Sequence, residues 1–395
     1  LKFYNNLLKE KGFNLTSIDS FLTNPNTTND DDKFLIKNNK NVQIELLNLG
    51  AMLSNSSINV NWINKYILNG SDRGNLNSAD KKNIINIFPS NGMGINPILN
   101  SKTGFQFKNF AFQLTPNIIS EFVIPNGLIE MIFEGNKLSN PINLSAKKNQ
   151  VQIVLPFSFS YGSEFRVPAL EKYFKRCYWG INAKYLGGIA YFESKFDTLK
   201  ITPNIEDIDI NLDLNTLYSL SGALLEVNNQ DPFNYSFNTN TISPFSFSGS
   251  GTAFDLGLIF EINNEINASM SITNIFGTIS WDKAFRHQLK LNSKVSLDEL
   301  QNDPKTKLAN GVVIDSNSVL KELKTKYPGN LIIGAELSKN KFSIASNIKF
   351  GFDNQIGNST TPRISFGAEL KPFSFISMLT GLSIGGYENF NGEQV

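Results

Sequence analysis

The 395-residue chain carries 36 basic and 35 acidic side chains, and its net charge of +1 excludes the strongly basic surface of a nucleic-acid-binding protein. Its hydrophobic fraction is 41%, and no run of about 18 apolar residues occurs, which excludes membrane-spanning helices. The single cysteine, Cys177, excludes an internal disulfide and a cysteine-based zinc site. The 32 phenylalanines are a high number that would suit a surface facing lipid.

Alternation of apolar and polar residues predicts strands over most of the chain, because side chains along a strand point to opposite faces in turn. Residues 151–161 give the clearest pattern, and their roughly eleven residues match the length that a tilted strand needs to cross a bilayer. Residues 105–114 predict a tight antiparallel hairpin around Lys108-Asn109. Weaker alternation predicts further strands at 42–53, 58–62, 179–185, 201–214, 331–337, 342–352, 364–370 and 378–384.

A second hairpin, at residues 253–273, has one apolar face and one face of small or polar groups. The predicted faces consist of Leu256, Leu258, Phe260, Ile266, Met270 and Ile272 on one side, and of Asp255, Ser269, Ser271 and Thr273 on the other. The hairpin alone fits two folds. In a soluble sandwich the apolar face packs on a core, whereas in a membrane barrel it faces lipid and the polar face lines the lumen.

Four short helices are expected between the strands. Ser78 is the expected N-cap of the first, and the second begins after Pro125 and ends before Gly135. The four helices are expected at residues 78–88, 125–134, 296–300 and 318–326. The last two lie within a long polar excursion, 282–329, and a second excursion, 214–250, reads as a loop. Such helices either plug a barrel or pack on a soluble sheet.

The connections between predicted strands favour the membrane barrel. Outer-membrane barrels have short turns on the periplasmic side and long loops on the outer side. Successive connections of an up-and-down sheet lie at opposite ends of its strands, so we expect all tight turns in the periplasm and both excursions, 214–250 and 282–329, outside the cell. The tight turns are 108–109, 263–265, 338–341 and 371–375.

Charged side chains within the predicted strands keep to the polar face. A charge facing lipid near the midplane costs roughly 2–4 kcal/mol, so a barrel requires this segregation, although a half-exposed soluble sheet would also show it. These candidate lumen-lining residues are Glu45, Lys184, Asp255, Glu336, Lys349, Arg363 and Glu369. They either line a channel or fill the barrel. Aromatic girdles at the membrane interfaces are expected at Trp179, Tyr191, Phe260 and Trp281.

No motif indicates catalysis or a cofactor. His287 is the only histidine and lies in the 282–329 excursion, where a surface position is expected. The aspartates near residue 207 do not have the spacing of a calcium-binding EF-hand loop. We therefore expect neither an enzyme nor a metal site.

Six segments resemble, in the same order, segments of a family of uncharacterised outer-membrane barrels from Bacteroidetes-like Gram-negative bacteria, which is similar in turn to PorV and to FadL-type transporters. The resemblance covers roughly residues 75–386. The segments are SADKKNIINIFPSNGMGIN, KNFAFQL, YWGINAKYLGGIAYFES, GTAFDLGLIFEINNEINASMSITNIFGTISW, YPGNLIIGAEL and TPRISFGAELKPFSFISMLTGLSIGG. Two departures are Leu379, where such chains often carry Arg, and the polar end Gly392–Val395, which lacks a terminal aromatic strand.

The resemblance implies one all-β domain over residues 1–395, an up-and-down transmembrane barrel of about 14 strands with a small plug. Residues 1–40 would then form part of the plug or lie in the periplasm. The implied function is to pass or hold small hydrophobic molecules in the bacterial outer membrane. The alternatives are a barrel that anchors a cell-surface or secretion complex through its long loops, and a soluble all-β binding module. The expected partners are membrane lipid, a hydrophobic molecule and other envelope proteins.

Overall fold

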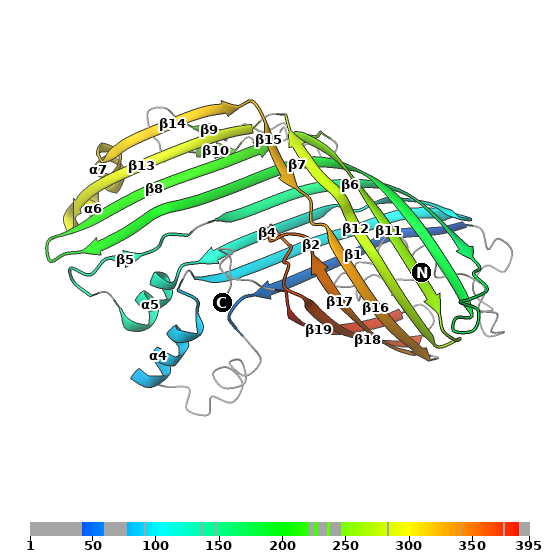
Figure 1. Ribbon diagram of the computed structural model, residues 1–395. Coiled ribbons are helices and arrows are strands. Elements are labelled where there is room, and N and C mark those ends of the chain that lie inside the picture. Colours follow the sequence, from blue (N-terminus) through cyan, green and yellow to red (C-terminus); the bar gives the residue numbers. More distant parts are fainter. Residues whose placement is uncertain are drawn as a thin grey trace.

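An antiparallel sheet of 17 strands dominates the computed structural model (Figure 1). The all-β class predicted from the alternation is therefore confirmed. The structure describes residues 42–58, 77–90, 92–135, 137–146, 148–220, 225–227, 235–237, 246–282, 284–339, 341–373 and 376–386. The expected N-terminal segment 1–40, and most of the expected strand 58–62, lie outside these residues.

The first eight strands precede a separate two-stranded hairpin. They are β1 (Val42–Asn55), β2 (Met93–Phe107), β3 (Phe110–Leu114), β4 (Asn117–Ile124), β5 (Ile142–Asn143), β6 (Asn149–Phe165), β7 (Arg176–Pro203) and β8 (Asp207–Leu220). The hairpin consists of β9 (Leu225–Val227) and β10 (Tyr235–Phe237). The remaining strands are β11 (Gly249–Glu261), β12 (Ile266–Trp281), β13 (Ala284–Ser296), β14 (Val312–Leu320), β15 (Leu323–Lys326), β16 (Asn330–Lys339), β17 (Phe342–Gly351), β18 (Arg363–Phe373) and β19 (Ile376–Gly385).

The sheet forks at β7, which is 28 residues long. β6 pairs along one edge of β7, while the other edge pairs first with β11, over residues 176–188, and then with β8, over residues 190–203. We call residues 190–203 with β8, β13, β14 and two short helices the flange, which extends to the upper left in Figure 1. The other strands of the sheet form the main sheet.

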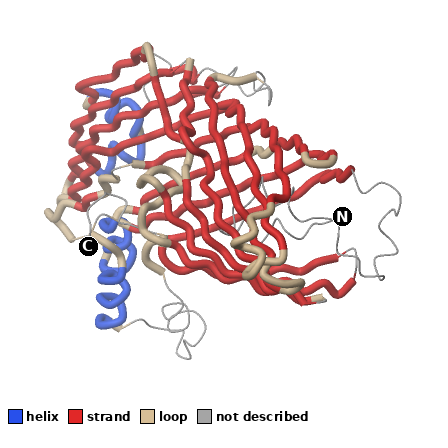
Figure 2. Tube along the Cα trace, turned by 45° about the vertical axis from the view of Figure 1, so that its right-hand side comes forward, coloured by secondary structure: helices blue, strands red, loops and turns tan. Residues whose placement is uncertain are grey.

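The main sheet curls strongly, so that side chains from distant strands meet on its inner face (Figure 2). Its two terminal strands are β1 and β19. They lie near each other. Arg363 of β18 pairs in register with Gly385 of β19, and its Nη1 is 3.4 Å from Met52 Sδ of β1. The connection 352–362 also packs onto this face, because a Cβ at Gly357 would lie 2.6 Å from Ile119 Cγ2 of β4.

The first two expected helices are present, but they lie outside the sheet. α4 (Ser78–Ile87) is capped by Asn77, whose side chain accepts from the Asp80 N–H at 2.8 Å, so the expected cap at Ser78 was wrong. α5 (Asn126–Glu134) begins after Pro125 and ends at Gly135, as predicted. Both helices lie beyond the ends of β2 and β4, opposite the 108–109 turn, and do not form a plug among the strands (Figure 1).

The two expected excursions contain more strand than predicted. Residues 214–220 belong to β8, and 284–296 and 312–320 of the second excursion form β13 and β14, joined by α6 (Leu297–Asn302) and α7 (Pro304–Asn310). α6 matches the helix expected at 296–300. The helix expected at 318–326 is wrong, because these residues pair with β13 and with Thr278–Trp281 as the end of β14 and as β15.

The tight turns lie together at one end of the main sheet, as their connectivity predicts. The Asn109 carbonyl accepts from the Gly162 N–H, and the Glu261 carbonyl from the Lys175 N–H. The Glu265 carbonyl accepts from the Ser338 N–H, and Phe342 pairs with Leu370 beside the last turn. Among the described residues, no helix has the length and apolar character needed to span a membrane.

Candidate functional site

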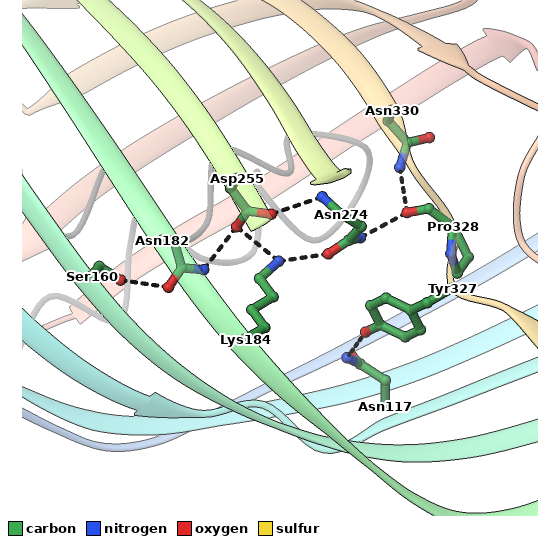
Figure 3. Close-up of polar contacts among 9 residues, drawn as sticks. All are labelled: Asn117, Ser160, Asn182, Lys184, Asp255, Asn274, Tyr327, Pro328 and Asn330. Atoms are coloured by element: carbon green, nitrogen blue, oxygen red, sulfur yellow. Dashed lines mark hydrogen bonds and ion pairs between the residues drawn. The ribbon is translucent and has the colours of Figure 1, made fainter. Parts of the chain in front are cut away.

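A group of interacting polar side chains on the inner face surrounds Asp255 of β11, which is 1% exposed (Figure 3). Its Oδ2 lies 2.8 Å from Lys184 Nζ and accepts from Asn182 Nδ2, also at 2.8 Å. Its Oδ1 accepts from the backbone N–H of Asn274 at 2.8 Å. Both carboxylate oxygens thus have donors, which stabilises a charge that would otherwise be expensive to bury.

Local sequence explains why these groups converge. Asp255 and Lys184 fall on the inward positions of β11 and β7, where alternate residues are buried. Asn274 reaches inward because β12 bulges there, with a φ of 54° at Asn274 and 58° at Phe276. Asn adopts this left-handed conformation more readily than most residues, and Phe276, which is 84% exposed, does so on the opposite side of the strand from the interior.

The cluster connects the strands to a segment that crosses the inner face. Lys184 Nζ donates to Asn274 Oδ1 at 2.6 Å, and Asn274 Nδ2 donates to the Pro328 carbonyl at 2.7 Å. On the far side of the segment, Asn117 Nδ2 of β4 lies 2.7 Å from the Tyr327 hydroxyl (Figure 3). Residues 327–330 therefore bridge β4 to β11 and β12 across the inner face.

The seven predicted lumen residues separate into groups. Lys184 and Asp255 form the ion pair above. Lys349 of β17 and Arg363 of β18 lie directly opposite each other near one end of the sheet. Glu336 and Glu369 lie nearer the tight turns, where Glu336 accepts from Ser338 at 2.7 Å and Glu369 pairs in register with Ser343. Glu45 lies in β1, but its side chain is outside the described part.

The prediction missed the uncharged members of the cluster. They are Asn117, Ser160, Asn182, Asn274, Tyr327 and Asn330. The alternation signal was present for Asn182, which lies between the apolar residues of β7. No local signal marks Asn274 or Tyr327, because a bulge and a crossing segment have no sequence period.

The predicted faces of the β11–β12 hairpin agree with the burial of their residues. Asp255, Ser271 and Thr273 are at most 4% exposed, while Leu256 and Met270 are 48% and 40% exposed. The expected girdle differs for two of its four residues, because Tyr191 and Trp281 are buried and pack together with ring centroids 5.7 Å apart.

His287 and Asp207 both lie in the flange, and the position of His287 differs from expectation. His287 is 2% exposed, with Nε2 2.8 Å from Asp315 Oδ1, so the expected surface position was wrong. Asp207 pairs with Lys294 at 3.1 Å. Within the described ranges, no group of three or more His, Cys, Asp or Glu side chains could hold a metal ion.

The helices of the flange carry a strong exposed charge contact. Lys307 donates to the Glu299 carboxylate at 2.6 Å, and the Ser296 backbone N–H donates to it at 3.1 Å. Together these donors lower the pKa of Glu299 to about 2. The Ser296 and Glu299 contacts form a capping box at the start of α6.

Comparison with known proteins gives a family but no function. No curated protein matches the chain. A model of a family described as a family of unknown function, DUF5723, matches residues 13–391. Because this match covers almost the entire chain, the protein belongs to the family of unknown function DUF5723.

Proposed function

We propose that the protein is an outer-membrane β-barrel, similar to PorV and FadL-type barrels, that passes or holds small hydrophobic molecules. The observation that carries the membrane location is a change in exposed side chains along the single strand β7. In its first half the exposed residues include Ile181 and Tyr185, each 44% exposed. In its second half they are Lys195, Asp197 and Lys200. A strand that contacts the same solvent along its whole length would not be expected to change its exposed side chains from apolar to charged.

The rest of the main sheet repeats the first half of β7. Its inner face buries polar residues such as Gln152, Asn347 and Glu369, each at most 2% exposed. Its outer face exposes large apolar side chains on most strands. Examples are Phe159, Phe254, Leu256, Ile333, Ile344, Phe366 and Leu382, which are 44–60% exposed. This is the arrangement of a barrel with lipid outside and a polar interior.

The pairing of the strands bears on the number of strands in the proposed barrel. β3 and β4 follow each other along the same edge of β6, so they act as one interrupted strand of the wall. β15 and β16 do the same along β12, and β5 and β6 do the same along β7. Counting each of these three pairs once reduces the 17 strands to 14. Three of the 14, β8, β13 and β14, belong to the flange, which we place outside the hydrocarbon, so 11 strands remain for the barrel wall, fewer than the expected 14.

A second candidate function is an anchor for a cell-surface or secretion complex. It is favoured by β14, which pairs with β13 along one edge and exposes Val313 by 59% and Val319 by 72%. An edge strand with exposed apolar side chains can pair with a partner chain.

The membrane location is tested with single cysteines in a Cys177→Ser background and a lipid-soluble quencher. Fluorescent label at position 270 should be quenched and label at position 271 should not, because Met270 is exposed and Ser271 is 2% exposed on the inner face. Extraction should require detergent, and unheated protein should migrate faster than heated protein on a gel. Quenching at 271 in place of 270, or solubility without detergent, would contradict the proposal.

Sidedness and function need separate measurements. Protease added to intact cells should cut in the flange, within 284–326, and spare the tight turns. Purified barrel in vesicles should bind a pyrene-labelled long-chain alkane if it holds hydrophobic molecules. If the alkane does not bind, while Val319→Lys releases an envelope protein that co-purifies with the wild type, the anchor function is the correct one.

A further inference from the structure

Strand β14 forms an edge of the flange. Among the strands that the structure describes, it pairs only with β13, and it is the upper border of the flange in Figure 1. Its side chains are accessible on both faces, because every residue from 313 to 319 is exposed. An edge of this kind presents backbone N–H and C=O groups that can pair with another strand.

The sequence of β14 lacks the features that protect many sheet edges from pairing. Residues 312–320, VVIDSNSVL, contain no lysine, arginine or proline. The register against β13 shifts once, at Val313, and is regular over 314–320. Val313 and Val319, near the two ends of the strand, are 59% and 72% exposed. These properties favour pairing with a further strand.

The strand is complementary to a second copy of itself. Two antiparallel copies related by a two-fold axis place one residue opposite its own copy, and an axis at Ser316 pairs all nine residues of β14. Val313 of each copy then lies opposite Val319 of the other. Asp315 lies opposite Asn317, whose amide can donate to a carboxylate. Apolar pairs and hydrogen-bonded pairs of this kind stabilise antiparallel strands.

Neighbouring registers are less favourable. An axis at Asp315 would place two carboxylates directly opposite each other, and like charges in this position destabilise a sheet. An axis at Asn317 would place Asp315 opposite Val319, which offers no donor. In either copy Asp315 Oδ1 lies 2.8 Å from His287 Nε2, and a carboxylate accepts at both oxygens, so a second donor can be accommodated. The sequence therefore favours the axis at Ser316.

We propose that two copies of this chain pair through β14, so that their flanges form one continuous antiparallel sheet across a two-fold axis at Ser316. The dimer goes beyond the proposed barrel, because it involves only the flange. It requires neither lipid around the main sheet nor a bound hydrophobic molecule, so its test is independent of both. A different envelope protein on β14 would occupy the same edge and exclude the dimer.

Single cysteines in a Cys177→Ser background test the register. Ser316→Cys should form an intermolecular disulfide on mild oxidation of the full chain, because position 316 lies opposite its own copy. Ser318→Cys is the matched control. Its own copy lies four residues further along, about 13 Å away at about 3.3 Å per residue, which exceeds the roughly 7 Å between the Cα atoms that a disulfide can join. Equal cross-linking at both positions, or at neither, would overturn the proposal.

An added charge tests the contact itself. Asn317→Asp places a carboxylate opposite Asp315 on both sides of the axis and should raise the dissociation constant of the dimer at least tenfold. Asn211→Asp adds the same charge at an exposed position of β8, away from the edge, and should change this constant less than twofold. Sedimentation of the full chain in a density-matched neutral detergent measures the constant, and circular dichroism checks that both variants fold.

Three outcomes contradict the dimer. The first is a monomer at every concentration, and the second is a dimer that Asn317→Asp leaves unchanged, which would use another surface. The third is a different envelope protein that co-purifies and is released by Val319→Lys, because β14 would then serve the anchor function.

Discussion

The main sheet and the flange share β7 but distribute polarity in opposite ways. In the main sheet, Asp255 and Asn182 are buried while Phe254 is 47% exposed. In the flange, Leu289 and Leu291 of β13 are buried, and Lys294 of the same strand is exposed. One continuous sheet therefore buries charged and amide side chains beside a hydrophobic cluster that includes Val154, Leu186 and Ile279 in one region, and buries leucines of β13 in the other.

The difference shows that burial alone does not identify the environment of a strand. What a strand exposes must match the medium around it, and under the proposed function the main sheet faces lipid and the flange faces water. The same contrast applies to ion pairs. Lys184–Asp255 has side chains 11% and 1% exposed, whereas Lys294–Asp207 has side chains 66% and 21% exposed.

The largest expected effect is the loss of the buried carboxylate. Asp255→Asn leaves the Lys184 charge buried without its counter-ion and should lower the free energy of unfolding by about 3–5 kcal/mol. Asp207→Asn breaks an exposed pair in the flange and should lower it by only about 0.2–1 kcal/mol. Urea unfolding of both variants in the same detergent measures the two values. Equal effects would mean that the interior cluster is open to water.

An added charge should distinguish the outer surfaces of the two regions. Leu256→Arg places a charge on the outer face of β11, where lipid contact near the midplane would cost about 2–4 kcal/mol. Val319→Arg, on the exposed edge of the flange, should stay within about 0.5 kcal/mol of the wild type. The measurement is reversible folding into lipid vesicles. If Leu256→Arg is as stable as Val319→Arg, the outer face of the main sheet contacts water.

A smaller effect is expected where the two regions separate. A Cβ at Gly249 would lie 2.7 Å from the Trp281 ring, and one at Gly188 would lie 2.8 Å from it. Gly249→Ala should therefore cost about 1–3 kcal/mol by overpacking. Trp281→Leu should restore part of the loss in the double variant, as measured by thermal unfolding. An additive double variant would show that the ring does not cause the strain.

The smallest effect concerns acid sensitivity of the flange helices. Because the folded pKa of Glu299 is about 2, below its ordinary value of 4.5, its contribution is complete above pH 4.5 and is lost as the pH falls toward 2. Hydrogen exchange in α6 and α7 should accelerate over this range. Glu299→Gln, which can keep the capping geometry without the charge, should remove the pH dependence. An unchanged profile in this variant would assign the effect to other carboxylates.

The sequence predicted the strands of the main sheet well because their alternation is local. It located Lys184 and Asp255 on the inner face, but the contact between them depends on the register of β7 against β11, which no local pattern specifies. It predicted the flange strand at 201–214 but missed β13 and β14, and it expected a helix at 318–326, where the chain forms strand through pairing with β12 and β13. The buried position of His287 depends likewise on Asp315, 28 residues away.

The hydrogen bond between Asn117 and Tyr327 has a consequence for the order of folding. The two residues are 210 positions apart in the chain, so the contact closes a very long loop. Closing a loop of this length lowers the chain entropy before the contact contributes favourable energy, so such contacts form slowly. We expect the hairpins around the tight turns to form first. The interior bridge can be completed only after the chain as far as residue 330 has arrived, so the inner face stays without this link until late in assembly.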